Sequence, residues 1–211
     1  PPTHDDDPVA GYDRMGASAA RAVVECGIER VVFQSSVGAE ARHGFGEIDG
    51  LGKTEDRLDS TGAAVTHLRC GYFFTNLLMD LESLQNGVLA TTLPLDQRIS
   101  FVDPRDVGDV AVARLLSDDW AGRHTQGVLG PADLSFSEVA DILSAASGRG
   151  IVAQRVSDDV VAQQLAGFGM TAAQVDGIVG MLRGFRGNFS PENSRDVIST
   201  TPTTLESWAY S

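Results

Sequence analysis

The sequence predicts an α/β fold, in which a Rossmann-like parallel sheet carries helices on both faces and a small helical cap follows at the C-terminus. Short apolar runs alternate with amphipathic stretches at intervals of roughly 30 residues, the pattern of repeated βα units. The apolar runs are nearly continuous, as in strands buried on both faces. The alternation opens on a helix with no strand before it. We therefore expect the N-terminal strands of the sheet to be absent from this chain.

The first half of the chain predicts three helices and two strands. Tyr12, Ala19 and Val23 fall on one helical stripe, and Gly27 is placed to end that helix. Val31 to Phe33 form a buried strand that runs into a loop at "SSVG". The expected elements are a helix over 11–27, a strand over 30–38, a helix over 51–60, a strand over 63–69 and a helix over 71–87.

The second half continues the pattern and then changes to helices. Pro104 suits the first turn of a helix, and Ser135 with Glu138 forms a capping box for another that ends near Gly148. The remaining expected elements are strands over 98–102, 124–130 and 151–156, helices around 160–165 and 175–182, and a short helix from Pro202. The pattern divides the chain into the later part of a Rossmann-like domain over 1–148 and a smaller helical region over 149–211.

Composition excludes several classes of function. The 211 residues carry a net charge of -13 without a cluster of Lys and Arg, so direct nucleic-acid binding is not expected. The two cysteines allow no disulfide framework, and the scattered histidines indicate no metal site. No apolar run approaches the roughly 18 residues of a membrane span. We expect a cytoplasmic protein without membrane contact.

Candidate binding residues follow the two central strands, because ligands of open parallel sheets lie beyond the carboxyl ends of the strands. This rule selects Ser35, Ser36 and Val37 after the first strand and "CGYFFTN", Cys70 to Asn76, after the second. Each group has a plain structural alternative. Serine hydroxyls often cap the next helix, and "GYFF" is often core packing. The polar Asn76 amid apolar neighbours fits a packing role less well.

The stretch "HGFGEIDGLGKTEDRL" contains half of a known catalytic pair. A tyrosine four residues before a lysine would place a phenol beside a cation on one helical face, but Asp49 stands four residues before Lys53. Lys53 near a helix start indicates a partner or ligand, or a solvated side chain. His43 lies in a glycine-rich loop where substrate would enter, and a lone histidine there is often incidental.

The chain resembles the NmrA-like branch of the atypical short-chain dehydrogenases/reductases. The resemblance rests on segments in the family's order: "RVVFQSSVGA", "KTEDRLDSTGAAVTHLRCGYFFTNLL", "ISFVDPRDVGDVAVARLL", "GVLGPADLSFSEVADILSAASGR" and "PTTLESWA". It implies an NAD(P)-binding Rossmann fold, with a glycine-rich N-terminal β-α-β unit that these residues lack. Members of this branch commonly lack the catalytic tyrosine, so Asp49 is not a departure from it. Cys70 is a departure from the family pattern, because the family usually has proline at this position.

Carried over by position, the resemblance implies a cofactor site. Pro1 and Pro2 would lie near the adenine and its ribose, Ser35 and Ser36 beneath the nicotinamide, and Lys53 on the nicotinamide ribose. The walls of the nicotinamide pocket would come from Val37, Cys70, Gly71, Tyr72, Phe73, Phe74 and Asn76. The resemblance also implies that the part over 1–148 binds a dinucleotide and that the helical region over 149–211 binds a substrate or partner.

Two hypotheses for function follow, and both keep NADP or NAD as the cofactor, with NADPH favoured. The first is an NAD(P)H-dependent oxidoreductase of small carbonyl or quinone substrates. His43 and Tyr72 are candidates for its proton donor, and the sequence indicates no other catalytic residue. The second is a non-catalytic redox sensor that acts through a partner protein. A homodimer is a further expectation, because an open sheet edge pairs readily with another chain.

Overall fold

The computed structural model of the chain describes residues 5–79, 81–187 and 189–210. Its central sheet holds β1 (Arg30–Ser36), β2 (Ala64–Cys70) and β6 (Arg123–Val128), all parallel and in the order β1-β2-β6. Ser36 lies opposite Cys70, and Cys70 lies opposite Val128, so these strands end at the same edge. The predicted parallel sheet is confirmed.

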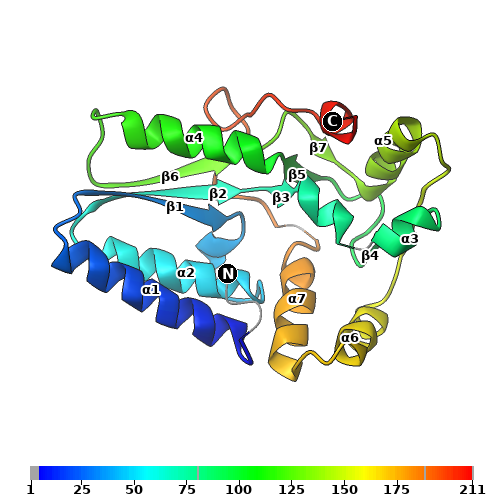
Figure 1. Cartoon of the computed structure of the whole chain (residues 1–211), viewed down its shortest axis with the longest axis horizontal. Helices are drawn as coiled ribbons and strands as arrows, with labels where there is room; N and C mark the ends of the chain where they lie inside the picture. Colours follow the sequence, from blue (N-terminus) through cyan, green and yellow to red (C-terminus); the bar gives the residue numbers. More distant parts are fainter. Residues whose placement is uncertain (1–4, 80, 188, 211) are drawn as a thin grey trace.

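Helices cover both faces of this sheet (Figure 1). The helices α1 (Pro8–Glu25) and α2 (Ile48–Asp59) pack on one face, and α4 (Pro104–Leu116) lies on the other. Side chains of β2 alternate between the two layers, as a strand requires. Val65 joins the cluster of Val23 and Leu58 below, whereas Leu68 joins that of Val107 above.

The helix starts follow the capping chemistry of the sequence. The Asp7 side chain accepts a hydrogen bond from the Ala10 amide at the start of α1, and Asp103 accepts one from the Arg105 amide at the start of α4. Ser135 forms the expected capping box at α5 (Phe136–Ser147), and Gly148 ends this helix with a φ of 67°. A left-handed residue at this position is why glycine is favoured there.

Two smaller sheets extend the molecule. One holds β3 (Tyr72–Phe73), β5 (Ile99–Val102) and β7 (Asp133–Leu134), and the other pairs β4 (Val88–Thr91) with β8 (Val152–Arg155). A second core, which includes Phe74, Phe101, Phe136 and Leu205, joins these sheets to α5 and to α8 (Leu205–Ala209). β4 lies before residue 148 and β8 lies after it, so this pair joins the two predicted parts of the chain. The division of the chain at residue 148 stays a prediction.

The predicted helix over 71–87 is wrong. In its place the described residues form β3, a 3-10 turn (Phe74–Leu78) and the short helix α3 (Leu81–Gln85). Tyr72 and Phe73 pair instead with Phe101 and Val102 of β5, a contact distant in sequence. Leu78 and Leu81 are about half exposed. The leucines at helical spacing therefore do not form one buried face of a helix. The short strands β4 and β7 were also not predicted.

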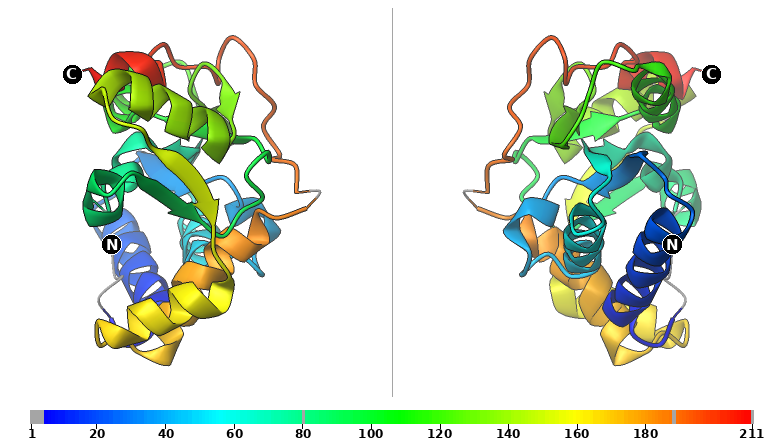
Figure 2. Two further views of the ribbon diagram at one scale, coloured as in Figure 1. Left: turned by 90° about the vertical axis from the view of Figure 1, so that its right-hand side faces the viewer. Right: turned by 90° about the vertical axis from the view of Figure 1, so that its left-hand side faces the viewer.

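The C-terminal part supplies α6 (Asp158–Gly167) and α7 (Ala172–Gly184), which confirm two expected helices. They lie below the sheets, and α7 contacts α1 (Figures 1 and 2). Residues 185–187 and 189–204, which we call the tail, then cross the molecule to reach α8. Throughout the described part of the chain, every helix is too short or too polar to span a bilayer.

Candidate functional site at the strand ends

The chain leaves β1 and β2 at one common edge. The Val37 amide donates to the Cys70 carbonyl at 3.0 Å, and the Gly71 amide donates to the Val128 carbonyl at 3.1 Å. These bonds continue the sheet by one residue past each strand. Ser36, Val37, Gly71 and Tyr72 therefore meet at the carboxyl edge, the place where open parallel sheets bind ligands.

The two serines of β1 point to opposite faces. Ser35 is buried, and its hydroxyl donates to Glu55 Oε1 at 2.6 Å on the α2 side. Ser36 is half-buried and donates to the Val37 carbonyl at 2.9 Å. Because side chains alternate along a strand, only one of the pair can face a given ligand. Ser35 is held by the protein, which leaves Ser36 as the serine nearer to a ligand role.

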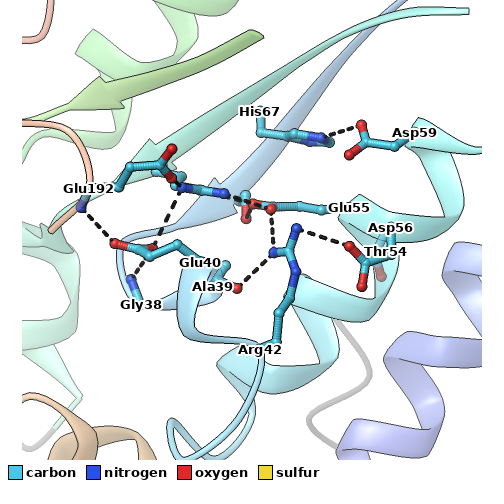
Figure 3. A network of polar contacts seen from close by, with 12 residues as sticks. Gly38, Ala39, Glu40, Arg42, Thr54, Glu55, Asp56, Asp59, His67 and Glu192 are labelled. Carbon is cyan, nitrogen blue, oxygen red and sulfur yellow. Dashed lines mark hydrogen bonds and ion pairs between the residues drawn. The ribbon is translucent and has the colours of Figure 1, made fainter. Parts of the chain in front are cut away.

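A buried ionic network lies under this edge (Figure 3). Glu55 is fully buried and accepts hydrogen bonds from Ser35, from Arg42 Nη1 at 2.6 Å and from Arg69 Nη2 at 2.9 Å. Burial raises the pKa of the Glu55 carboxyl, but the hydrogen bonds from Arg69, Ser35 and Arg42 outweigh it and set the pKa at about 2. Glu55 is thus a permanent anion at neutral pH.

The same network reaches the tail. Arg69 pairs with Glu192, whose amide donates to Glu40 Oε1 at 3.0 Å, and Glu40 Oε2 accepts from the Gly38 amide at 2.9 Å. The loop after β1, the end of β2 and the tail are thereby tied together. The sequence analysis did not identify this cluster, although a charged Arg69 inside an apolar strand was a usable signal, since buried charges require partners.

Lys53 lies on the other side of α2. The sidechains of Lys53 and Glu55 are about 200° apart on a helix, since each residue turns the chain by about 100°. Lys53 is exposed, and together with the hydrogen bond from Arg57 its charge helps to lower the pKa of Asp13 in α1. The structure therefore directs Lys53 toward α1 and does not bring it to the serines.

Asp49 holds the glycine-rich loop. Its carboxylate accepts hydrogen bonds from the Gly44 amide at 3.0 Å and from the Phe45 amide at 2.9 Å. The residue in the tyrosine position is thus a structural anchor. His43 is exposed in the same loop, and Phe45 packs edge-on against Phe185.

The aromatic residues after β2 divide between two cores. Tyr72 packs edge-on against Phe101 and Phe136, with ring centroids 5.2 and 6.2 Å away, and burial raises its pKa to about 12. Phe74 is buried against Trp208. Phe73 packs on the α4 side of the sheet. Of these residues, only Tyr72 offers a group that donates a proton.

The remaining predicted residues have mixed surroundings. Cys70 is buried, which raises its thiol pKa to about 12 and keeps it protonated. Asn76 is half-buried, and its carbonyl accepts from the Met79 amide. Pro1 and Pro2 lie outside the described residues.

Ser100 is a polar residue that the sequence analysis missed. A Cβ at Gly71 would lie 2.8 Å from Ser100 Oγ, and this hydroxyl is buried with no hydrogen-bond partner among the described residues. A buried polar atom without a partner is uncommon and marks a place for a ligand or water. Ser100 thus lies at the same edge as Ser36, Val37, Gly71 and Tyr72, whose assignment to a cofactor site stays a prediction.

The comparisons with known proteins agree with this fold. No family model matches the chain. It is 30% identical over 167 residues to the NAD(P)H azoreductase of Xenophilus azovorans, a match that covers 77% of this chain and 57% of the azoreductase.

Two solved structures are similar over 92% of this chain. One is the NADPH-dependent quinone oxidoreductase of Escherichia coli complexed with NADPH (TM-score 0.74, 22% identity, 69% of that chain). The other is the triphenylmethane reductase of Citrobacter sp. complexed with NADP(H) (TM-score 0.73, 18% identity, 69% of that chain). Both share the fold of this chain. At these identities the likeness extends to the fold alone.

Proposed function

We propose that this chain belongs to an NAD(P)H-dependent oxidoreductase of the NmrA-like, atypical short-chain dehydrogenase/reductase type, which reduces quinone-like or azo substrates. The observation that carries the proposal is its 30% identity to an NAD(P)H azoreductase. The strand edge built by Ser36, Val37, Gly71 and Tyr72 supports it, because that edge is where a Rossmann-like sheet binds a dinucleotide.

The residues of the edge have separate roles in this proposal. Ser36 and the orphan hydroxyl of Ser100 would hold the polar end of a nicotinamide, and Tyr72 would line its face. Bound NADPH would supply the hydride. The buried Glu55–Arg69 pair fixes the ends of β1 and β2 beneath that site. We favour NADPH over NADH as the cofactor.

Little acid catalysis is required for a quinone substrate, whereas the nitrogen anion formed by hydride transfer to an azo bond has to be protonated. The reduced form of a quinone is a stabilised phenolate, so water can complete the protonation. Asp49 is engaged by two loop amides and is not placed as an acid. Tyr72, with a pKa of about 12, stays protonated at neutral pH and is our candidate donor for substrates that need one. On this proposal, reduction of a quinone would not need a catalytic tyrosine in the position of Asp49.

The test is a calorimetric titration of NADPH and NADH, followed by an assay of NADPH oxidation with a quinone and an azo dye. It uses this chain and a version extended by a glycine-rich β-α-β unit of the kind the resemblance implies. Ser36→Val should weaken NADPH binding at least tenfold by filling the edge, whereas Ser60→Val, on the far end of α2, should not.

Three outcomes decide among the proposals. Binding with turnover supports the reductase. Binding without turnover of any tested acceptor overturns it in favour of a dinucleotide sensor that signals to a partner protein. Absence of binding by both versions contradicts both functions.

A further inference from the structure

A cavity of about 360 Å³ lies beside β6, at the sheet edge opposite β1. Its volume is within the range of small-molecule sites. The tail walls it on one side and α4 on the other. We call it the β6 cavity, and it is lined by Arg114, His124, Thr125, Gln126, Gly127, Glu192, Asn193, Ser194, Asp196, Ile198 and Ser199.

Arg114 is the unusual member of this lining. Each other arginine that is at least partly buried in the described residues pairs with an aspartate or glutamate, and these are Arg30, Arg42, Arg57, Arg69, Arg186 and Arg195. Arg114 has no such pair within the described part of the chain. A partly buried guanidinium without an anion is costly, and burial accordingly lowers the pKa of Arg114.

The protein holds Arg114 rigidly and leaves its outer nitrogens available. Nε donates to Thr66 Oγ1 at 2.9 Å, and the guanidinium carbon lies 4.3 Å from the centroid of the Trp120 ring. Trp120 is itself fixed, because its indole N–H donates to the Arg114 carbonyl at 3.0 Å. The two terminal Nη groups, which suit a bidentate carboxylate, have no partner in the described residues.

The acidic groups of the lining are already occupied. Glu192 pairs with Arg69, and Asp196 accepts from the amides of Ile198 and Ser199 at 2.9 and 2.7 Å. By contrast, Asn193 Oδ1 is buried and lacks a donor among the described residues. The cavity thus has one unmatched cation, and the buried acceptor of Asn193 becomes available to a ligand when its side-chain amide turns toward the cavity.

From these two unmatched groups we infer that the β6 cavity binds a small hydroxy- or amino-carboxylic acid. Its carboxylate would pair with Arg114, and its hydroxyl or ammonium group would donate to Asn193 Oδ1. A monoanion fits better than a phosphate dianion, because Glu192 and Asp196 also line the cavity and the chain carries a net charge of -13. This site is separate from the proposed cofactor edge.

The test follows the indole N–H resonance of Trp120 in nitrogen–proton NMR spectra, assigned by its persistence in Trp208→Phe. The probes are L-serine, L-lactate, acetate, inorganic phosphate and sodium chloride. We expect saturable shifts with L-serine or L-lactate, weaker binding of acetate, and no saturation with phosphate or chloride. Asn193→Ala should remove the advantage of L-serine and L-lactate over acetate.

Arg114→Gln should abolish saturable binding of the acids. Arg149→Gln, which changes an exposed arginine that has no ion pair within the described residues, should leave that binding intact. The inference is overturned if chloride or phosphate matches the carboxylic acids, if no acid gives saturation, or if folded Arg114→Gln still binds. Should Arg114→Gln fail to fold, the wild-type probe series and Asn193→Ala decide the matter. Neither result depends on whether the chain binds NADPH.

Discussion

At the scale of single residues, the carboxyl edge of the sheet depends on charges that are buried and matched. Glu55 and Arg69 are 0% and 2% exposed, and each satisfies the other while Ser35 and Arg42 complete the set. Breaking one partner of such a pair leaves an unmatched buried charge, which costs more than the pair itself contributes. A substitution at Glu55 or Arg69 should therefore lower the free energy of unfolding by a measurable amount.

Glu55→Gln should lower the free energy of unfolding by about 3–5 kcal/mol at neutral pH, because Arg42 and Arg69 keep their charges and lose the buried anion between them. Arg69 is left with Glu192, whose side chain is half exposed. The folded pKa of Glu55 is about 2, below its usual 4.5, so its stabilisation is complete above pH 4.5 and is lost as the pH falls toward 2. Urea unfolding across this pH range checks both points, and the acid-dependent loss should be smaller in Glu55→Gln.

Asp56→Asn is the matched control, since Asp56 pairs with the same Arg42 but is 61% exposed. We expect this change to cost less than about 1 kcal/mol. An equal cost for both substitutions would contradict the argument from burial.

Tyr72→Phe separates the two kinds of substrate. The change keeps the ring between Phe101 and Phe136 but removes a phenol with a pKa of about 12. If the proposed function holds, reduction of a ketone should fall at least tenfold, in line with typical general-acid contributions of about 10²–10⁴. Reduction of a quinone should stay within about twofold. Steady-state rates on both substrates measure this, and an equal loss on both would exclude a proton-donor role.

At the scale of elements, glycines let α7 approach the glycine-rich loop. A Cβ on Gly46 would lie 2.0 Å from the Gly177 carbonyl, and one on Gly184 would lie 2.5 Å from the Phe45 ring. The Glu47 amide donates to the Gly177 carbonyl at 3.2 Å across this contact. The helix α7 thus contacts the loop through its backbone at Gly177, in addition to the packing of Phe45 against Met181 and Phe185.

Gly46→Ala should therefore destabilise the chain by more than Gly44→Ala. Both glycines have positive φ, 56° and 87°, so both substitutions strain the backbone. Only Gly46 meets the backbone of α7, since a Cβ at Gly44 contacts nothing within 4 Å. We expect an additional loss of about 1–3 kcal/mol, as for overpacked sites. Thermal unfolding of the two variants measures the difference, and equal midpoints would refute the contact.

At the scale of the whole molecule, the tail joins parts that are distant in sequence. It pairs with Arg69 through Glu192, runs beside β6 where the Leu129 amide donates to Ser199, and reaches α8 past Asp106. Asp103 caps α4, whereas Asp106 accepts hydrogen bonds from the Thr203 amide at 3.0 Å and from the Thr203 hydroxyl at 2.7 Å. The tail thus brings α8 to the second core and forms one wall of the β6 cavity.

Asp106→Ala should release the end of the tail. It removes two hydrogen bonds to a buried carboxylate, at a cost of about 1.5–3 kcal/mol. Amide hydrogen exchange should accelerate in α8 and at Thr201, with little change in β2. Asp109→Ala, one turn further along α4 and exposed, is the control and should leave exchange unchanged. Uniform acceleration over the whole chain would mean that the tail is not a separate unit.

The sequence by itself determined the parallel sheet, its flanking helices and their caps. These features are local, because continuous apolar runs, helical stripes and residues such as Asp103, Ser135 and Gly148 act within a few positions of the chain. It also selected the strand ends as the place for a ligand, because the carboxyl ends of parallel strands meet at one edge.

Only the tertiary structure decided which side chains face that edge. Periodicity could not show that Ser35 is held by Glu55, that Lys53 turns toward α1, or that Tyr72 pairs with β5 instead of continuing a helix. The Arg69–Glu192 pair joins residues 123 positions apart, and the lack of an anion beside Arg114 among the described residues depends on which segments surround it in space. These outcomes depend on contacts between distant segments, and local sequence does not encode them separately.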